Sequence, residues 1–137
     1  MSSQPVRYIL DSYAVLAMLA GEQGAVRVQA ILEAAQREEA QVYLSLINLG
    51  EILYITERER GLPLAQKTLS AIDQLPLTIL AVTRDRVLAA AHLKANFPMA
   101  YADAFATAAA QEFDGIVVTG DPEFSMVETL IQIEWLY

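Results

Sequence analysis

The 137-residue sequence predicts an α/β protein with a central parallel sheet of four to five strands. Two observations lead to this class. Segments with the composition of strands alternate along the chain with segments of helical periodicity. The strand segments, such as VRYIL, are apolar at nearly every position. Such runs indicate strands that are covered by helices on both faces of a parallel sheet.

The first elements follow this alternation. Residues 6–10 form the first expected strand, because β-branched and aromatic side chains follow one another there. Ser12 is the expected cap of a short helix that stops at Gly21. Apolar residues then recur every three to four positions and predict an amphipathic helix over residues 24–39.

The middle of the chain repeats the pattern. Residues 41–45 are the second expected strand, and Ser45 is placed to cap a helix that stops at Gly61. Prolines bound a further helix over residues 64–74. The apolar run at residues 77–82 predicts the third strand.

The last elements complete the expected sheet. Thr83 is placed to cap a helix that is broken by Pro98, and an alanine-rich helix follows over residues 101–113. Residues 115–119 predict the fourth strand, and residues 131–136 predict a fifth.

Composition excludes several classes of protein. No repeat, low-complexity tract or linker interrupts the sequence, so residues 1–137 are expected to form a single domain. The longest uncharged stretch, residues 40–50, is too short to cross a bilayer, and Asp11 interrupts the first apolar segment in a way that disfavours a secretion signal. The absence of cysteine excludes disulfides and thiolate zinc sites. The sequence therefore predicts a cytoplasmic protein that is not inserted in a membrane.

Four of the 17 acidic residues stand in apolar surroundings with no Lys or Arg within three positions: Asp11, Glu51, Asp103 and Asp121. A buried carboxylate without a positive partner costs several kcal/mol. Asp11 and Asp121 directly follow expected strands, whose carboxyl ends meet at one edge of a parallel sheet. Glu51 and Asp103 lie on helices that begin near the same edge. All four are therefore expected at one end of the sheet.

Such a group of acids has a specific chemistry. Carboxylates gathered in one crevice repel one another unless they share protons or bind cations. Hard oxygen ligands select Mg²⁺ or Mn²⁺ over zinc. The net charge of −8 disfavours a simple electrostatic binder of nucleic acid, but a bound cation can bridge a carboxylate and a substrate phosphate.

Each acid also has an ordinary structural explanation. Asp11 and Asp121 could cap the segments that follow them. Glu51 could be an exposed helical position, and Asp103 a favourable charge in a first helical turn. The joint placement of all four is what favours a functional site.

The stretches YILDSYAVLAML, SLINLGEILY, ADAFATAAA and VVTGDPEF resemble, in order and spacing, the four acidic motifs of the PIN-domain nucleases. The closest resemblance is to the VapC-type toxins of toxin–antitoxin pairs, and it covers nearly the whole chain. The resemblance implies a three-layer α/β/α sandwich and Mg²⁺- or Mn²⁺-dependent hydrolysis of RNA. It also implies a cognate antitoxin protein and a homodimer.

The resemblance extends to individual residues. The acids that match the metal-binding and catalytic quartet are Asp11, Glu51, Asp103 and Asp121. Thr119 matches the hydroxyl residue that steadies these carboxylates or their waters. Ser12 and Asn48 match polar positions beside the first and second acids. Glu123 is expected to be a solvated loop residue instead of a member of the site.

The leading hypothesis is an endoribonuclease that acts as a toxin and uses water activated by metal, with no side-chain nucleophile. A housekeeping PIN-type nuclease acting on RNA or DNA, and a non-catalytic binding module of the same fold, stay open as alternatives. An aspartyl-phosphate phosphatase is disfavoured, because Tyr13 occupies the position where that chemistry needs a second aspartate.

Overall fold

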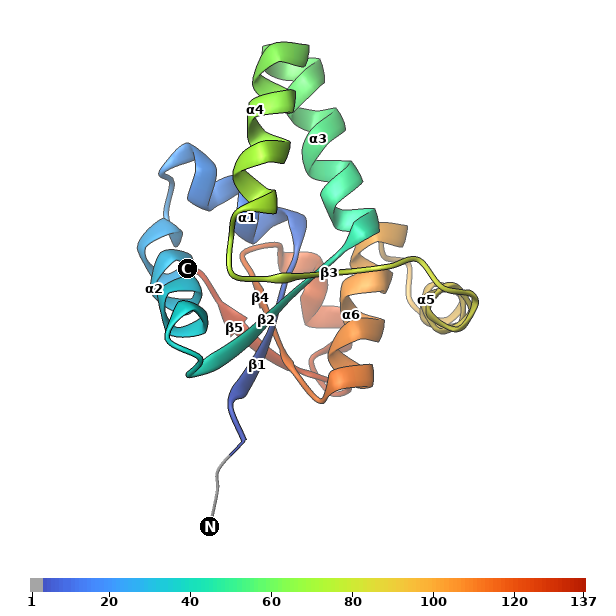
Figure 1. Cartoon of the computed structure of the whole chain (residues 1–137). Helices are drawn as coiled ribbons and strands as arrows, with labels where there is room; N and C mark the ends of the chain where they lie inside the picture. Colours follow the sequence, from blue (N-terminus) through green and yellow to red (C-terminus); the bar gives the residue numbers. More distant parts are fainter. Residues whose placement is uncertain (1–3) are drawn as a thin grey trace.

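Five parallel strands form the central sheet of the computed structural model, which describes residues 4–137 (Figure 1). The first three residues of the expected domain lie outside this range. In spatial order the strands are β3 (Thr78–Leu80), β2 (Ala40–Ser45), β1 (Val6–Leu10), β4 (Ile116–Thr119) and β5 (Gln132–Trp135). Every neighbouring pair is parallel, which confirms the predicted class.

Within residues 4–137, six α-helices and one 3₁₀ helix connect the strands. They are α1 (Ser12–Ala20), α2 (Ala25–Gln36), α3 (Leu46–Arg60), α4 (Leu62–Asp73), α5 (Arg84–Asn96), α6 (Tyr101–Phe113) and the 3₁₀ helix η1 (Pro122–Val127). Figure 1 shows α1 and α2 on one side of the sheet and α5 and α6 on the other, while α3 and α4 extend beyond it as a helical pair.

The two faces of the sheet have separate apolar cores. Ile9 and Val117 point to the core that includes α5 and α6. The adjacent residues Leu10 and Val118 point to the opposite core, which includes α1, α2 and the first half of α3. All four side chains are fully buried. Successive side chains of a strand therefore enter opposite cores, which explains why the strands are apolar at every central position. This arrangement confirms the three layers.

The order of the strands reverses direction at β1. From β1 the chain builds outward through β2 and β3, then returns to add β4 on the other side of β1. Leu10 and Val118 are register partners, so the residues that follow them emerge side by side. Ligands of open α/β sheets bind at such a switch point, beyond the carboxyl ends of the strands.

Most predicted boundaries agree with the structure to within one residue, and four predictions differ. Helix α4 begins at Leu62 instead of Leu64, because Pro63 is accommodated in its first turn, where no backbone N–H is needed. Strand β3 is shorter than residues 77–82, because it pairs only with the last three residues of β2. Helix α2 ends at Gln36, and Glu38 turns the chain toward β2 with a φ of 60°. The cap of α1 is Asp11 instead of Ser12, since the Asp11 side chain accepts a hydrogen bond from the Ala14 backbone N–H.

Ser45 caps α3 as predicted, since its Oγ accepts a hydrogen bond from the Ile47 backbone N–H at 3.1 Å. Ser45→Ala is expected to lower the free energy of unfolding by about 1 kcal/mol, the usual effect of losing a serine cap. Urea denaturation measures the change. The control is Ser70→Ala at an exposed position inside α4, where alanine is the better helix former and no loss is expected. Equal stability of both variants would contradict a capping role for Ser45.

Within residues 4–137 no single helix is both long and apolar enough to span a membrane; α1 and α2 reach that threshold only as a pair, with a bend of 105° between them.

Candidate metal centre at the sheet switch point

The carboxyl ends of β1 and β4 place Asp11 and Asp121 beside each other at the switch point. Asp11 directly follows β1 and is 1% exposed. Asp121 lies two residues beyond β4 and begins η1, where its Oδ1 accepts a hydrogen bond from the Glu123 backbone N–H at 3.0 Å. Both acids therefore cap the segments that follow them. Capping does not exclude a second role, because each carboxylate can accept several further contacts.

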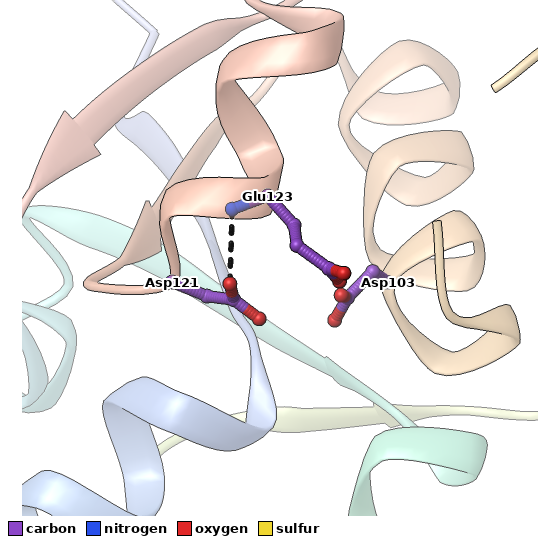
Figure 2. A group of neighbouring side chains, drawn as sticks. All are labelled: Asp103, Asp121 and Glu123. Atoms are coloured by element: carbon purple, nitrogen blue, oxygen red, sulfur yellow. Dashed lines mark hydrogen bonds between the residues drawn. The ribbon is translucent and has the colours of Figure 1, made fainter. Parts of the chain in front are cut away.

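Three carboxylates come together in one group. Oxygens of Asp103, Asp121 and Glu123 all lie within 4.8 Å of one another. Asp103 is contributed by the first turn of α6 and is 6% exposed. Figure 2 shows Glu123 reaching from η1 toward Asp103, with Asp121 facing them from the end of β4. A donor set made only of carboxylate oxygens fits Mg²⁺ or Mn²⁺.

Glu123 is the one member of this group that the sequence did not assign to the site. Its exposure agrees with the expectation of a solvated residue, but its carboxylate is not isolated from the other acids. The proline at position 122 starts the 3₁₀ turn that directs Glu123 back over Asp121. The sequence signal that could have indicated this placement of Glu123 is the proline directly after Asp121, followed by Glu.

Glu51 lies on α3, partly buried, and Asp11 lies deeper in the sheet edge. Neither belongs to the group formed by Asp103, Asp121 and Glu123, but the negative charges of both raise the pKa of Asp103. We refer to Asp11, Glu51, Asp103, Asp121 and Glu123 together as the acidic site. The other three acids selected from the sequence are thus close enough to Asp103 to raise its pKa.

The pKa values of the two most buried acids, Asp11 and Asp103, are raised by burial and by the neighbouring carboxylates. Burial raises the pKa of Asp11 to about 7, against hydrogen bonds from Thr119 and Ala14 that favour the ionised form. Burial also raises the pKa of Asp103 to about 8. Neighbouring charges add to this second shift, in decreasing order those of Asp121, Asp11, Glu51 and Glu123. Without a cation, the site resists carrying its full negative charge.

No positive side chain compensates the acidic site within the described part of the chain. The ion pairs there are Arg27–Glu134, Arg37–Glu39 and Arg86–Glu112. All of them lie away from the five acids. A cluster of acids that lacks basic partners has the charge and donor set for a divalent cation.

Thr119 connects the two acids at the strand ends. Its hydroxyl donates a hydrogen bond to Asp11 Oδ2 and accepts one from the Asp121 backbone N–H at 2.9 Å. Thr119 is fully buried, so neither bond can be replaced by bulk water. The side chain therefore holds Asp11 and Asp121 in a defined relative position.

Thr119→Val keeps the shape of this side chain but removes both hydrogen bonds. We expect the free energy of unfolding to fall by about 1–3 kcal/mol, since a buried carboxylate and a backbone N–H lose a partner. The affinity for Mn²⁺ should fall as well, because Asp11 is no longer oriented. Urea denaturation and Mn²⁺ titration measure the two effects. Thr119→Ser, which keeps the hydroxyl, should retain both properties; a valine variant equal to wild type would show that the hydroxyl does not organise the site.

Ser12 and Asn48 form a second buried connection, between α1 and α3. The Asn48 Nδ2 donates to Ser12 Oγ at 3.1 Å, and Ser12 Oγ donates to the Asn48 carbonyl oxygen at 3.3 Å. This pair ties the residue after Asp11 to the helix turn before Glu51. Asn48 Oδ1 is the one buried side-chain polar atom of the described residues that has no partner. Such an acceptor calls for a donor, such as a bound water, at this position.

The fold and the site define a class: α/β proteins whose switch point carries an acidic centre suited to divalent cations. The sequence pattern of the PIN domain matches residues 8–130. The chain belongs to the PIN domain family, which confirms the resemblance seen in its motifs.

Solved structures share this fold. VapBC2 from Rickettsia felis, solved bound to a DNA fragment from its promoter, is similar with a TM-score of 0.75 and 14% identity, over 96% of this chain and 100% of that one. A sarcin–ricin loop cleaving toxin, VapC20 from Mycobacterium tuberculosis, has a TM-score of 0.69 and 18% identity, over 88% and 94% of the two chains. A toxin–antitoxin complex from Klebsiella pneumoniae has a TM-score of 0.69 and 18% identity, over 95% and 98%. Comparison with curated protein sequences gave no significant match.

Proposed function

We propose that this protein is a metal-dependent endoribonuclease and the toxin of a type II toxin–antitoxin pair. The observation that supports the proposal most directly is the acidic site at the switch point, which has no basic partner in the described chain. The similarity of the fold to toxins, one of which cleaves the sarcin–ricin loop, supports the same class of activity. We further propose that residues 1–137 act as one domain in the cytoplasm.

In this proposal the metal ligands are Asp11, Glu51, Asp103 and Asp121, and the position of Glu123 adds a fifth carboxylate. A bound Mg²⁺ or Mn²⁺ ion would lower the pKa of the attacking water and would neutralise negative charge at the scissile phosphate. The donor set fits such an ion because it offers only carboxylate oxygens, and two of these carboxylates, Asp11 and Asp103, have raised pKa values in its absence.

The protein's own residues would orient the reacting groups and transfer protons. One ionised carboxylate of the acidic site would accept the proton of the water whose oxygen attacks phosphorus, and the leaving ribose oxygen would take up a proton from solvent as its bond to phosphorus breaks. Thr119 orients Asp11 and Asp121 during this step. Ser12 and Asn48 keep α1 and α3, and hence Asp11 and Glu51, in register. No side-chain nucleophile is required.

The proposed antitoxin has a candidate docking groove. A pocket of about 680 Å³ lies between α1, α3 and α4. Its wall is largely apolar, with Leu16, Leu19, Ile55 and Leu64 among the lining side chains. An amphipathic helix of the antitoxin fits a groove of this character. We also propose that the protein acts as a homodimer.

Two alternatives predict different behaviour. A housekeeping nuclease of the same fold would cleave nucleic acid without being toxic to the cell that expresses it. A non-catalytic binding module would show neither cleavage nor a response to Mn²⁺. Toxicity on induction, relieved by co-expression of a neighbouring open reading frame, distinguishes the toxin from both.

The decisive experiment is cleavage of a mixed RNA pool with Mn²⁺, followed by mapping of the cut sites. We expect the wild-type protein to cut RNA only when Mn²⁺ is present, and EDTA or Asp103→Asn to stop the cutting. Equal activity of the wild type and the Asp103→Asn variant would reject the assigned site. No cleavage by a folded wild-type protein would reject the proposed activity.

A further inference from the structure

Tyr13 lies directly beside the acidic site, two residues after Asp11 in the first turn of α1. Its phenol end lies against Gly120, the residue between Thr119 and Asp121. A Cβ at position 120 would overlap Cε1 and Cζ of Tyr13 and would lie 2.8 Å from its hydroxyl oxygen. Only glycine at position 120 therefore allows the ring to approach the end of β4 so closely.

Tyr13 is nevertheless 42% exposed. The other tyrosines of the described chain each have an aromatic or cationic partner, although Tyr54 and Tyr101 are also exposed. Tyr43 stacks on Phe113, Tyr101 packs against Phe105, and Arg58 lies over Tyr54. Within residues 4–137 no aromatic ring or cation packs on Tyr13 in this way. Tyr13 thus leaves part of an aromatic side chain accessible next to Gly120, at the edge of the acidic site.

The charge of the site makes such a surface useful. No ion pair of the described residues involves the five acids, so no basic side chain offsets their repulsion of the phosphates of a nucleic acid. Proteins that bind single strands add affinity by stacking bases on exposed aromatic rings, a contact that does not depend on charge.

We propose that Tyr13 is a substrate-binding residue that stacks on one nucleobase next to the scissile phosphate of single-stranded RNA. This inference rests on the proposed ribonuclease function. It assigns to Tyr13 a contribution to substrate affinity, and it leaves the chemistry of hydrolysis to the acidic site.

The test uses the full chain, Mn²⁺ and a short RNA that contains one mapped cut site, together with copies of this RNA that lack a single base on either side of the cut. For the wild type, removal of the stacked base should raise KM roughly 5- to 100-fold, the effect of losing one aromatic stack. Tyr13→Leu should raise KM for the intact RNA by a similar factor, with kcat nearly unchanged, and removal of the base should then have no further effect. Tyr13→Phe, which keeps the ring, should behave as wild type.

Gly120→Ala provides an independent variant, because the added methyl group displaces the ring without removing it. It should raise KM when Tyr13 is present and should add little in the Tyr13→Leu background. A methyl group that acted on Thr119 or Asp121 directly would raise KM or lower kcat equally in both backgrounds, and this result would contradict the inference.

The remaining outcomes separate the two proposals. Cleavage by the wild type with an unchanged KM for Tyr13→Leu overturns the role of Tyr13 and leaves the ribonuclease intact. The same result combined with weaker inhibition by a protein partner would assign Tyr13 to the groove between α1, α3 and α4, which it also lines. Absence of RNA cleavage by the wild type overturns both proposals.

Discussion

Asp103→Asn is expected to abolish metal-dependent cleavage and, at the same time, to raise the stability of the metal-free protein. Activity should fall by about 10³-fold or more, equivalent to roughly 4 kcal/mol, because the carboxylate that we propose as a central cation ligand loses its charge. Stability should rise by roughly 2–4 kcal/mol near pH 7.5, because Asp103 is buried among four other carboxylates and its pKa is raised to about 8. For a chain of this length the melting temperature should increase by roughly 5–15 °C.

The matched control is Asp114→Asn, at the opposite and exposed end of the same helix. Asp114 has a φ of 51°, a conformation that asparagine adopts readily, so its replacement should change stability by less than about 0.5 kcal/mol. Thermal melts of both variants in EDTA and in Mn²⁺ give the comparison. A metal-free Asp103→Asn protein that melts below wild type would show that repulsion at the acidic site does not limit stability.

The metal-free wild type should lose stability as the pH rises from 5 to 8. Asp11 and Asp103 have folded-state pKa values of about 7 and about 8, well above the ordinary value of 3.8. The folded protein therefore binds more protons than the unfolded chain across this window, and the free energy of unfolding falls with increasing pH. Above a pH of about 8 both groups are ionised in either state, and their contribution to the slope ends. Urea midpoints measured in EDTA at several pH values record the effect.

Saturating Mn²⁺ should reverse this pH dependence. Cations bind ionised carboxylates, so affinity and the resulting stabilisation increase as the acids lose their protons. A cation at 100 times its dissociation constant adds roughly 2.7 kcal/mol to the folded state. Asp103→Asn should flatten the slope in EDTA and remove most of the response to Mn²⁺. Identical pH profiles of the wild type with and without Mn²⁺ would contradict cation binding at this site.

Much of the fold could be predicted from the sequence because its signals are local. Ser45 and Thr83 cap helices by hydrogen bonds to backbone groups two or three residues away. Gly21 ends α1 in the left-handed conformation that the other residues disfavour. The length of β3 could not be predicted in this way, because it depends on how far its neighbour β2 continues before Ser45 starts a helix.

The acidic site was partly predictable for a different reason. Asp11 and Asp121 are adjacent because parallel strands end at the same edge, which the alternation of elements already implies. The inclusion of Glu123 depends on the 3₁₀ turn after Asp121, whose direction no periodicity encodes. The contact between Tyr13 and Gly120 joins two strand ends that are more than 100 residues apart in the sequence, so it required the three-dimensional structure.

The order of the strands has a consequence during synthesis. Because β4 pairs with β1, Asp11 gains its neighbour Asp121 only after the chain up to and beyond Asp121 has left the ribosome. An emerging chain that ends before Asp103 holds only two of the five carboxylates. The growing polypeptide therefore cannot assemble the acidic site until the segment that contains Asp121 and Glu123 has been released and has folded onto β1.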